Sequence, residues 1–226
     1  MIISLHIPKT AGTSFRIALK EHFGDSLTED YETRPFRLNY DIAKKNAEKF
    51  NRKINGKKYL KVKCIHGHFL ALKYANFKNL DATFITWLRD PVERLISNYY
   101  HITRGQKDVK GTFSYLVHTE NWDLETYCLH PLNRNPYEKI FRDFGIENFD
   151  FVGIVENYLG DLKFFSENYL HKPLNIYFEN QKPEFQHSNI DSGFRKKIEK
   201  FHSIDLEIYQ QALIKSNSIH KSKLPI

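Results

Sequence analysis

Short apolar runs recur along the chain and predict five strands. They are Ile2–Ile7, Leu60–Ile65, Thr83–Leu88, Phe151–Val155 and Leu174–Phe178. Several of these runs are continuously apolar or β-branched, which is typical of strands that are covered on both faces. Coverage of both faces favours a parallel sheet, because the helices that connect parallel strands pack on each side of it.

Segments with helical spacing lie between these runs. They are Ser14–His22, Ile42–Phe50, Pro91–His101, Tyr158–Tyr169 and Phe194–Lys215, the last as two helices broken near Ser203. Pro91 stands at a first helical position, where proline is tolerated. Strands that alternate with helices predict an α/β fold with a central, mainly parallel sheet.

The chain length favours a single domain over residues 1–226. A chain of 226 residues with 41% hydrophobic residues is long enough to form one sizeable core. The stretch Gly105–Arg134 has the least regular pattern, and we expect an insertion there. The opening segment Met1–Pro8 is too short and too soon interrupted for a signal peptide or a membrane span. We therefore expect no stable membrane insertion.

Charge and cysteine content exclude few classes of partner or compartment. The net charge of +7 favours anionic partners such as nucleotides, acidic polysaccharides, nucleic acid or a membrane surface, and simple solubility explains it as well. The cysteines are Cys64 and Cys128, far apart in sequence. No disulfide framework is expected from two cysteines, although a single bridge stays open, and a reducing compartment fits.

The turn after the first predicted strand has the composition of an anion site. The segment Leu5–Phe15 supplies a cation at Lys9, a glycine at Gly12 and hydroxyls at Thr13 and Ser14, which can also cap the following helix. Unpaired N–H groups and the helix dipole attract anions at such a turn. The Walker A pattern is absent, because the lysine precedes the glycine. An ordinary capped helix start is the alternative.

A second strand-to-helix turn carries Arg89 and, eight residues later, Ser97. Ligands of open α/β sheets meet the carboxyl ends of the strands, where Arg89 is expected. Its planar guanidinium suits a phosphate. In the alternative interpretation, Arg89 pairs with Asp90 or Glu93, and Ser97 has no functional role.

The third element is the His66-Gly67-His68 sequence, directly after a predicted strand. A histidine with a pKa near 6.5 can remove a proton from a hydroxyl group at neutral pH. Structural hydrogen bonding is an equal alternative. A metal site is disfavoured, because no carboxylate or cysteine pattern accompanies the pair. His101 is a weaker candidate base.

No acidic residue occurs between Glu48 and Asp81, and this stretch contains nine Lys or Arg residues. The basic residues that could attract an anionic polysaccharide are Lys49, Arg52, Lys53, Lys57, Lys58, Lys61 and Lys63. A solvated surface is an equally good interpretation.

Two of these motifs resemble the donor-binding elements of carbohydrate sulfotransferases that use 3′-phosphoadenosine 5′-phosphosulfate (PAPS). Ile7-Pro-Lys-Thr-Ala-Gly-Thr-Ser14 is similar to the 5′-phosphosulfate loop of the heparan sulfate and uronyl 2-O-sulfotransferases and their bacterial relatives. Arg89-Asp-Pro-Val-Glu-Arg-Leu-Ile-Ser97 resembles their 3′-phosphate element, and His66-Gly-His68 their catalytic histidine pair. Phe151–Glu156 also looks like a late strand of this family.

The resemblance implies roles for individual residues. Lys9, Thr10, Gly12, Thr13 and Ser14 would hold the 5′ side of PAPS, and Arg89 with Ser97 the 3′-phosphate. His68 would be the catalytic base, His66 a supporting residue and Lys9 the cation at the leaving oxygen. The roles of Arg94, which would hold its helix or reach the acceptor, and of Glu156 stay open.

The resemblance also implies a P-loop NTPase-like three-layer sandwich, with residues 105–134 as a lid or acceptor-binding insertion. The acceptor would be a carbohydrate, expected to be anionic, with no nucleic acid partner. No metal is expected, because a sulfuryl group carries less charge than a phosphoryl group. The compartment would be cytoplasmic for a complete chain, and the Golgi lumen for one trimmed from a membrane-anchored protein.

Two alternatives from other classes stay open. A nucleotide-dependent phosphotransferase would need a Walker lysine after the glycine and a carboxylate for its metal, and neither stands in the sequence. A non-catalytic module that binds polysaccharide or nucleic acid would need exposed aromatic residues among the basic ones. Tyr59 and Tyr74 are the only such residues in the basic stretch.

Overall fold

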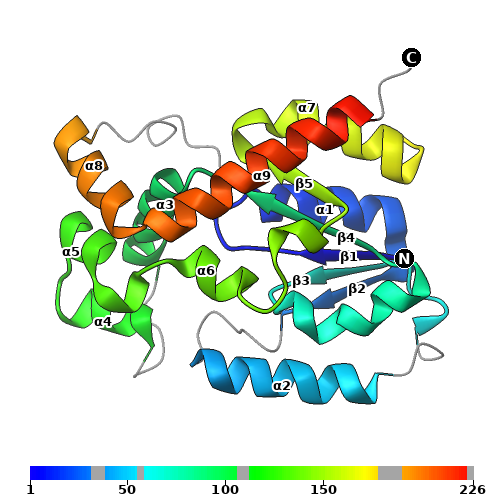
Figure 1. Ribbon diagram of the computed structural model, residues 1–226, viewed down its shortest axis with the longest axis horizontal. Coiled ribbons are helices and arrows are strands. Elements are labelled where there is room, and N and C mark those ends of the chain that lie inside the picture. The colour runs from blue at the N-terminus through cyan, green and yellow to red at the C-terminus, as the bar shows by residue number, and fades with distance from the viewer. Residues whose placement is uncertain (32–38, 55–58, 106–111, 178–189, 223–226) are drawn as a thin grey trace.

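Five parallel strands form one sheet in the order β2-β3-β1-β4-β5 (Figure 1). This computed structural model describes residues 1–31, 39–54, 59–105, 112–177 and 190–222. The strands are β1 (Ile2–Leu5), β2 (Leu27–Asp30), β3 (Cys64–Gly67), β4 (Thr83–Leu88) and β5 (Phe151–Ile154). The predicted α/β fold with a parallel central sheet is confirmed.

The sequence located β1, β4 and β5 well, placed β3 too early, missed β2 and predicted one strand that the described residues do not contain. The Leu60–Lys63 stretch precedes β3 as a turn, because Leu60 is 83% exposed and the Val62 N–H bonds to the Tyr59 carbonyl. Strand β2 was missed, since its sequence LTED has no apolar run and it lies at the edge of the sheet. The predicted strand Leu174–Phe178 is wrong for residues 174–177, and Phe178 lies outside the described residues.

Helices connect the strands and cover both faces of the sheet. They are α1 (Gly12–Phe23), α2 (Tyr40–Lys53), α3 (Pro91–Arg104), α4 (Phe113–Thr119), α5 (Leu124–Leu129), α6 (Pro136–Phe141), α7 (Tyr158–Phe165), α8 (Ser192–Phe201) and α9 (Ser203–Ser222). A 3₁₀ segment, Ala71–Leu80, links β3 to β4, and a π-helical turn, Ser166–Leu170, extends α7. The predicted break near Ser203 is confirmed, because α8 ends at Phe201.

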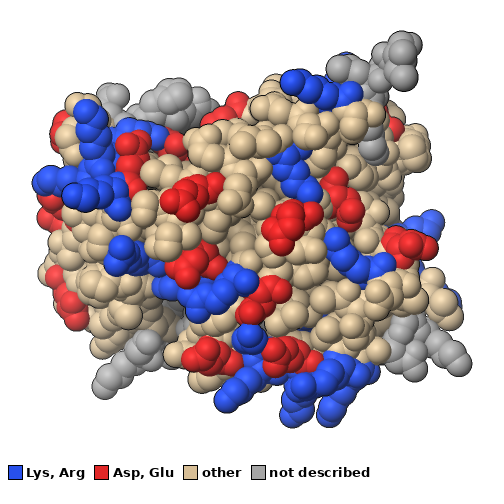
Figure 2. All heavy atoms as spheres, in the orientation of Figure 1, with Lys and Arg blue, Asp and Glu red and all other residues tan. Residues whose placement is uncertain are grey.

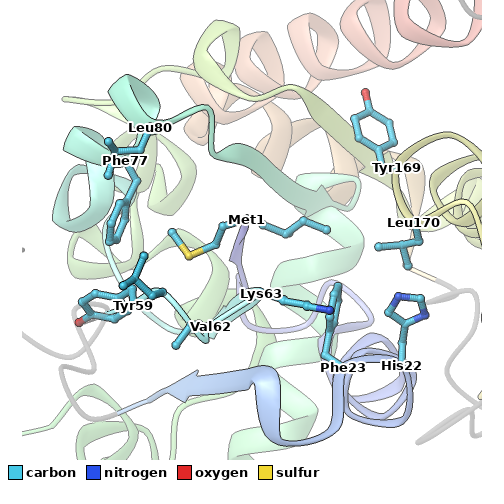
Figure 3. Close-up of a pocket in the computed structure, with 12 residues that line it drawn as sticks. Met1, His22, Phe23, Tyr59, Val62, Lys63, Phe77, Leu80, Tyr169 and Leu170 are labelled. Atoms are coloured by element: carbon cyan, nitrogen blue, oxygen red, sulfur yellow. The ribbon is translucent and has the colours of Figure 1, made fainter. Parts of the chain in front are cut away.

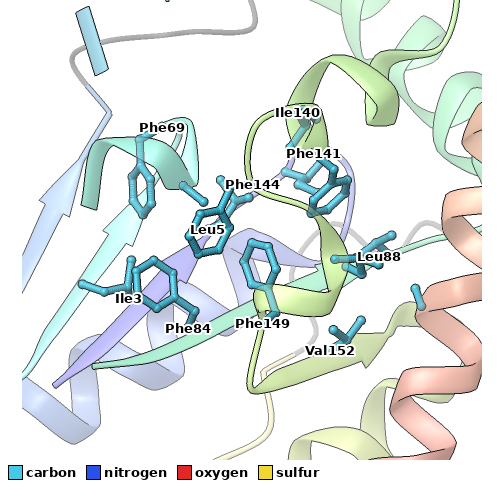
Figure 4. Packing of buried hydrophobic residues seen from close by; sticks show 14 of the residues in the cluster. Ile3, Leu5, Phe69, Phe84, Leu88, Ile140, Phe141, Phe144, Phe149 and Val152 are labelled. Atoms are coloured by element: carbon cyan, nitrogen blue, oxygen red, sulfur yellow. The ribbon is translucent and has the colours of Figure 1, made fainter. Parts of the chain in front are cut away.

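Two apolar cores lie on opposite faces of the sheet and make a three-layer sandwich. On one face, Phe84 and Leu88 of β4 pack with Phe141, Phe144 and Phe149 (Figure 4). On the other, the cluster contains side chains from α1 and α7 together with residues of β4 and β5: Phe15, Leu19, Ile85, Trp87, Phe151, Leu162 and Phe165. The burial of these apolar side chains is the main force that holds the sheet and the helices on its two faces together.

The region predicted as an insertion is partly helical. Residues 105–134 contribute α4 and α5, and residues 106–111 lie outside the described part of the chain. Val117, Trp122 and Tyr127 from this region form a third cluster with α3 and α8. Within the described residues, no helix has both the length and the apolar content needed to span a membrane.

Candidate functional site

The carboxyl ends of β3, β1 and β4 lie side by side, and two of the predicted motifs follow β1 and β4. The third does not follow its strand as predicted, because His66 and Gly67 lie inside β3 and only His68 comes after it. Strand β1 is the neighbour of both other strands, with Leu5 paired to Gly67 of β3 and to Thr86 of β4. The loop after β1 therefore lies between the His66–His68 segment and the turn that begins at Arg89. Strand order alone brings together residues that are far apart in the sequence.

The loop after β1 presents backbone N–H groups at the start of α1. Lys9 and Ala11 have left-handed φ angles of 71° and 58°. Such residues turn successive N–H groups toward one concave side, which binds anions. Ala11 is the N-cap of α1 and gives no side-chain cap, and the first turn contains no acidic residue. The unpaired N–H groups and the helix dipole thus favour an anion here.

The hydroxyl groups of this loop differ in their surroundings. The helix begins at Gly12, so Thr13 and Ser14 lie in its first turn, and the expectation that they cap it is wrong. Thr13 is exposed, whereas Ser14 is buried. Thr10 is also buried, and its hydroxyl donates to the Ile7 carbonyl at 2.9 Å. The Thr10 side chain therefore shapes the loop, because its hydroxyl is bonded within the loop.

Positive side chains from two elements gather beside this loop. Burial lowers the pKa of Lys9, and the charges of Arg89 and Arg104 lower it further. Burial also lowers the pKa of His101, with Lys9 and Arg104 adding to the shift. An anion bound among these cations would relieve their mutual repulsion. Arg104 was missed in the sequence, although it lies seven residues after Ser97 and shares its helix face.

The turn that carries Arg89 is fixed through its backbone. The Tyr137 hydroxyl donates to the Arg89 carbonyl at 2.7 Å. In the alternative interpretation Arg89 pairs with Asp90 or Glu93, but both acids bind Arg195, whose guanidinium lies 3.0 Å from Asp90 and 2.9 Å from Glu93. Among the described residues Arg89 has no ion-pair partner, so its side chain stays available to a ligand. Ser97 is half-buried on α3.

Glu156 and Arg94 support the site from behind. Glu156 accepts from the Asp90 N–H at 3.0 Å and from the Tyr209 hydroxyl at 2.9 Å, which links β5 to the start of α3 and to α9. Arg94 is 4% exposed, with its guanidinium 5.2 Å from the centre of the Tyr137 ring. These contacts place Arg94 in the packing of α3, in line with the expectation that it holds its helix.

Three histidines and a tyrosine cluster at the ends of β1, β2 and β3. The His6 ring centre lies 5.2 Å from that of His66 and 4.5 Å from that of His68. The Tyr31 hydroxyl lies 3.0 Å from His6 Nδ1, and its ring lies 4.8 Å from that of His68. His66 Nδ1 lies 2.8 Å from Ser4 Oγ. His68 is thus flanked by two rings that restrict its orientation.

Burial sets the protonation of this cluster. It lowers the pKa of His66 to about 3, with smaller contributions from the charges of His68 and Arg16. Burial likewise lowers the pKa of His6 well below its ordinary value, and His66, His68, Arg16 and Lys9 add to the shift. At neutral pH these two imidazoles are uncharged. His66 is almost fully buried, which suits its predicted supporting role.

His6 and Tyr31 were missed by the sequence analysis. His6 stands at the end of the first strand, which was a signal, but Tyr31 follows a strand with no apolar run. The His6 ring also explains a glycine, because a Cβ atom on Gly12 would lie 1.7 Å from His6 Nε2. His6 therefore contacts both the anion-binding loop and the histidine pair.

Other features of the described residues lie apart from these motifs. No group of three or more His, Cys, Asp or Glu residues within them is arranged to hold a metal ion. Cys64 and Cys128 are both free and buried, in different clusters. A shallow hollow of about 510 Å³ lies at the opposite, amino edge of the sheet (Figure 3). Met1, Phe23, Phe77 and Leu170 line it, and none of the predicted donor-binding or catalytic residues does.

Comparison with known proteins identifies the family of the chain. The human and orangutan (Pongo abelii) heparan sulfate 2-O-sulfotransferase 1 proteins are each 29% identical to this chain over 106 residues, which is 46% of this chain and 30% of each relative. The chicken (Gallus gallus) protein is 28% identical over the same length. The aligned segment thus spans about a third of these relatives. The model of the sulfotransferase family matches residues 1–220, and the chain belongs to this family.

Proposed function

We propose that this chain transfers a sulfuryl group from PAPS to a hydroxyl group of a carbohydrate. The start of α1, which has no side-chain cap, carries this proposal together with Lys9, Arg89 and Arg104, because it joins the N–H end of a helix dipole to a group of cations. PAPS has a 5′-phosphosulfate and a 3′-phosphate, and two anion sites on neighbouring strands suit a ligand with two anionic ends. The residues present therefore fit the donor.

Each part of the site has a task in the proposed reaction. The loop N–H groups with Thr13 and Ser14 hold the 5′ side, and Arg89 with Ser97 holds the 3′-phosphate. His68 accepts the proton of the acceptor hydroxyl while its oxygen forms a bond to sulfur. The bond from sulfur to the 5′-phosphate oxygen breaks, and Lys9 stabilises the charge that develops on that oxygen. Positioning and charge stabilisation supply most of the catalysis in such a displacement.

The surroundings of His68 support its role as base. The His6 and Tyr31 rings restrict the orientation of its imidazole, and a positioned imidazole is an effective general base. The similarity to heparan sulfate 2-O-sulfotransferase 1 favours a carbohydrate acceptor. We expect the acceptor to be anionic, in keeping with the net charge of +7.

Calorimetric titration with adenosine 3′,5′-bisphosphate, the expected product, tests the donor site. Wild type should bind it more tightly than ATP with Mg²⁺. Arg89→Ala should weaken binding by about 10- to 100-fold, because a hydrogen bond to a charged group contributes roughly 1.5–3 kcal/mol. Arg142→Ala is the matched control, since Arg142 pairs with Glu138 and is not one of the proposed donor-binding residues.

Equal affinity of wild type and Arg89→Ala, or a preference for ATP with Mg²⁺, would contradict the proposal and favour a phosphotransferase. If the bisphosphate binds selectively, carbohydrate acceptors are screened with PAPS that carries a labelled sulfuryl group. His68→Ala should then abolish measurable turnover and leave bisphosphate affinity within about twofold, because the proposed base does not contact the nucleotide.

A further inference from the structure

One face of α2 carries a row of exposed cations outside the proposed site. Lys45, Lys49, Arg52 and Lys53 are all exposed. Lys45, Lys49 and Lys53 follow one another at intervals of four residues, and Arg52 is three residues after Lys49. The four therefore lie along one side of the helix and span roughly 12 Å. We call these four residues the α2 cation row. In Figure 2 basic side chains gather along the lower edge of the molecule, where α2 lies in Figure 1.

The opposite side of α2 holds the helix against the protein. Ala43 and Ala47 are buried and pack with Leu70, and Phe50 packs against the main core. The helix is therefore anchored by its apolar side, and the α2 cation row points to solvent. A rigid helix presents its charges in a fixed line.

Acidic partners for the row are missing within the described residues. None of its four members lies within ion-pair distance of a carboxylate there, whereas Lys44 pairs with Asp143 and Glu48. Helices elsewhere in the molecule carry mixed pairs at the same spacing, such as Arg142 with Glu138 and Arg195 with Glu199. The α2 cation row therefore presents four positive charges that no carboxylate of the described residues neutralises by direct contact.

Spacing within the row is unfavourable for an isolated protein. Lys45, Lys49 and Lys53 are like charges four residues apart, an arrangement that destabilises a helix by about 0.2–0.5 kcal/mol per pair. A bound polyanion would remove this repulsion and release counterions.

The row also leads away from the proposed site. Ala43 and Ala47 contact Leu70, which lies two residues beyond the candidate base His68. Further along, Asn51 accepts from the Asn76 N–H at 3.0 Å, toward the end of the segment that returns to β4. A chain that left the carboxyl edge of the sheet and continued along α2 would meet Lys45 first and Lys53 last.

We propose that the α2 cation row is a second contact surface for an anionic polysaccharide, the acceptor of the proposed function on which this inference rests. Nucleic acid is disfavoured, because single strands use aromatic stacking as well as charge. The aromatic residues of α2 are engaged elsewhere, with Phe50 in the core and Tyr40 bonded to Asp143. Tyr74 is 3% exposed and Tyr59 packs on Phe77, so neither accompanies the row.

The test compares two variants that each remove four positive charges. One is Lys45→Gln/Lys49→Gln/Arg52→Gln/Lys53→Gln. The control is Lys20→Gln/Lys163→Gln/Lys172→Gln/Lys221→Gln, whose members are also exposed but lie outside α2. The probes are unsulfated heparosan chains of 6 and 20 sugars, a single-stranded DNA of 20 nucleotides, and adenosine 3′,5′-bisphosphate. Affinities are measured at several salt concentrations.

The row variant should bind the long heparosan chain at least about tenfold more weakly than the control, with a shallower salt dependence. The short chain should lose less than the long one, because it is too short to fill the proposed site and the row together. Affinity for the bisphosphate should not change. Equal binding of the long chain by both variants would overturn the inference.

An equal loss for DNA and heparosan would overturn the assignment to polysaccharide, since it would show a surface for any polyanion. Failure of the proposed function gives a different result. A wild-type chain that binds heparosan through the row but not the bisphosphate would contradict sulfuryl transfer and support the contact surface.

Discussion

At the scale of residues, His6 connects the two halves of the candidate site. Its ring lies against Gly12 in the anion-binding loop and beside His66 and His68 in the histidine pair. Tyr31 bonds to its Nδ1 atom, so the ring is held on several sides and has little freedom to rotate away. The geometry of the loop and that of the candidate base therefore depend on one side chain.

This contact predicts an unusual cost for Gly12→Ala. Alanine normally favours a helix, but the added Cβ would lie 1.7 Å from His6 Nε2. Overpacking of this kind costs about 1–3 kcal/mol, so the urea midpoint should fall. The double variant Gly12→Ala/His6→Ala should recover part of the loss, since it removes the overlap. Strictly additive effects in this cycle would show that the two residues do not compete for space.

At the scale of elements, one side of α2 packs against the protein and the other faces solvent. Ala43, Ala47 and Phe50 attach it to the protein, whereas the α2 cation row makes no ion pair with any described residue. Its stability in the free protein should therefore be limited by repulsion between neighbouring lysines.

Reversing the middle charge should stabilise the free protein. Lys49→Glu replaces three repulsive contacts, to Lys45, Arg52 and Lys53, with three attractive ones. The expected gain in unfolding free energy is about 1 kcal/mol at low salt, and it should shrink as salt is added. Lys44→Glu is the control variant on the same helix. It loses the contact to Asp143 and should therefore destabilise the protein. The Tm of both variants and of wild type is measured at two salt concentrations. A Tm for Lys49→Glu below that of wild type would argue against repulsion within the α2 cation row.

At the scale of the whole molecule, buried histidines link stability to pH. Burial lowers the pKa of His66 to about 3 and that of His202 to about 4, and lowers that of His6 as well. The unfolded chain binds protons at these positions below about pH 6.5, so stability is present above that pH and is lost as the pH falls. Burial raises the pKa of Asp205 to about 6, which opposes this trend in the same range.

The histidines outnumber Asp205, so unfolding free energy should fall between pH 7 and pH 5. Each buried histidine contributes a loss of about 2 kcal/mol at pH 5. His202→Asn should reduce the number of protons taken up on unfolding by about one, and so flatten the dependence of the unfolding free energy on pH. The reason is that His202 Nε2 bonds to the Cys128 carbonyl and its ring is enclosed. Urea unfolding at pH 7, 6 and 5 measures this pH dependence of the unfolding free energy. The control is His171→Asn, because His171 is exposed. An unchanged slope in His202→Asn would contradict this origin.

Much of the fold was determined by the sequence alone. Continuous apolar runs located β1, β4 and β5, since a strand covered on both faces must be apolar throughout. Strand β2 could not be found this way, because an edge strand needs no such run and its pairing to β3 is decided by tertiary contact. The Leu60 and Leu174 runs failed for the converse reason, since apolar residues can also lie in turns or at the surface.

The candidate site divides in the same way. The local sequence identified Lys9, Gly12, Arg89 and the His66–His68 pair, because each motif is a short segment whose chemistry is visible in its own residues. Only the strand order could bring these segments to one edge and add His6, Tyr31 and Arg104 to them. Local order records which groups a chain carries, whereas the packing of distant strands decides which of them meet and which, like Arg94, turn into the core.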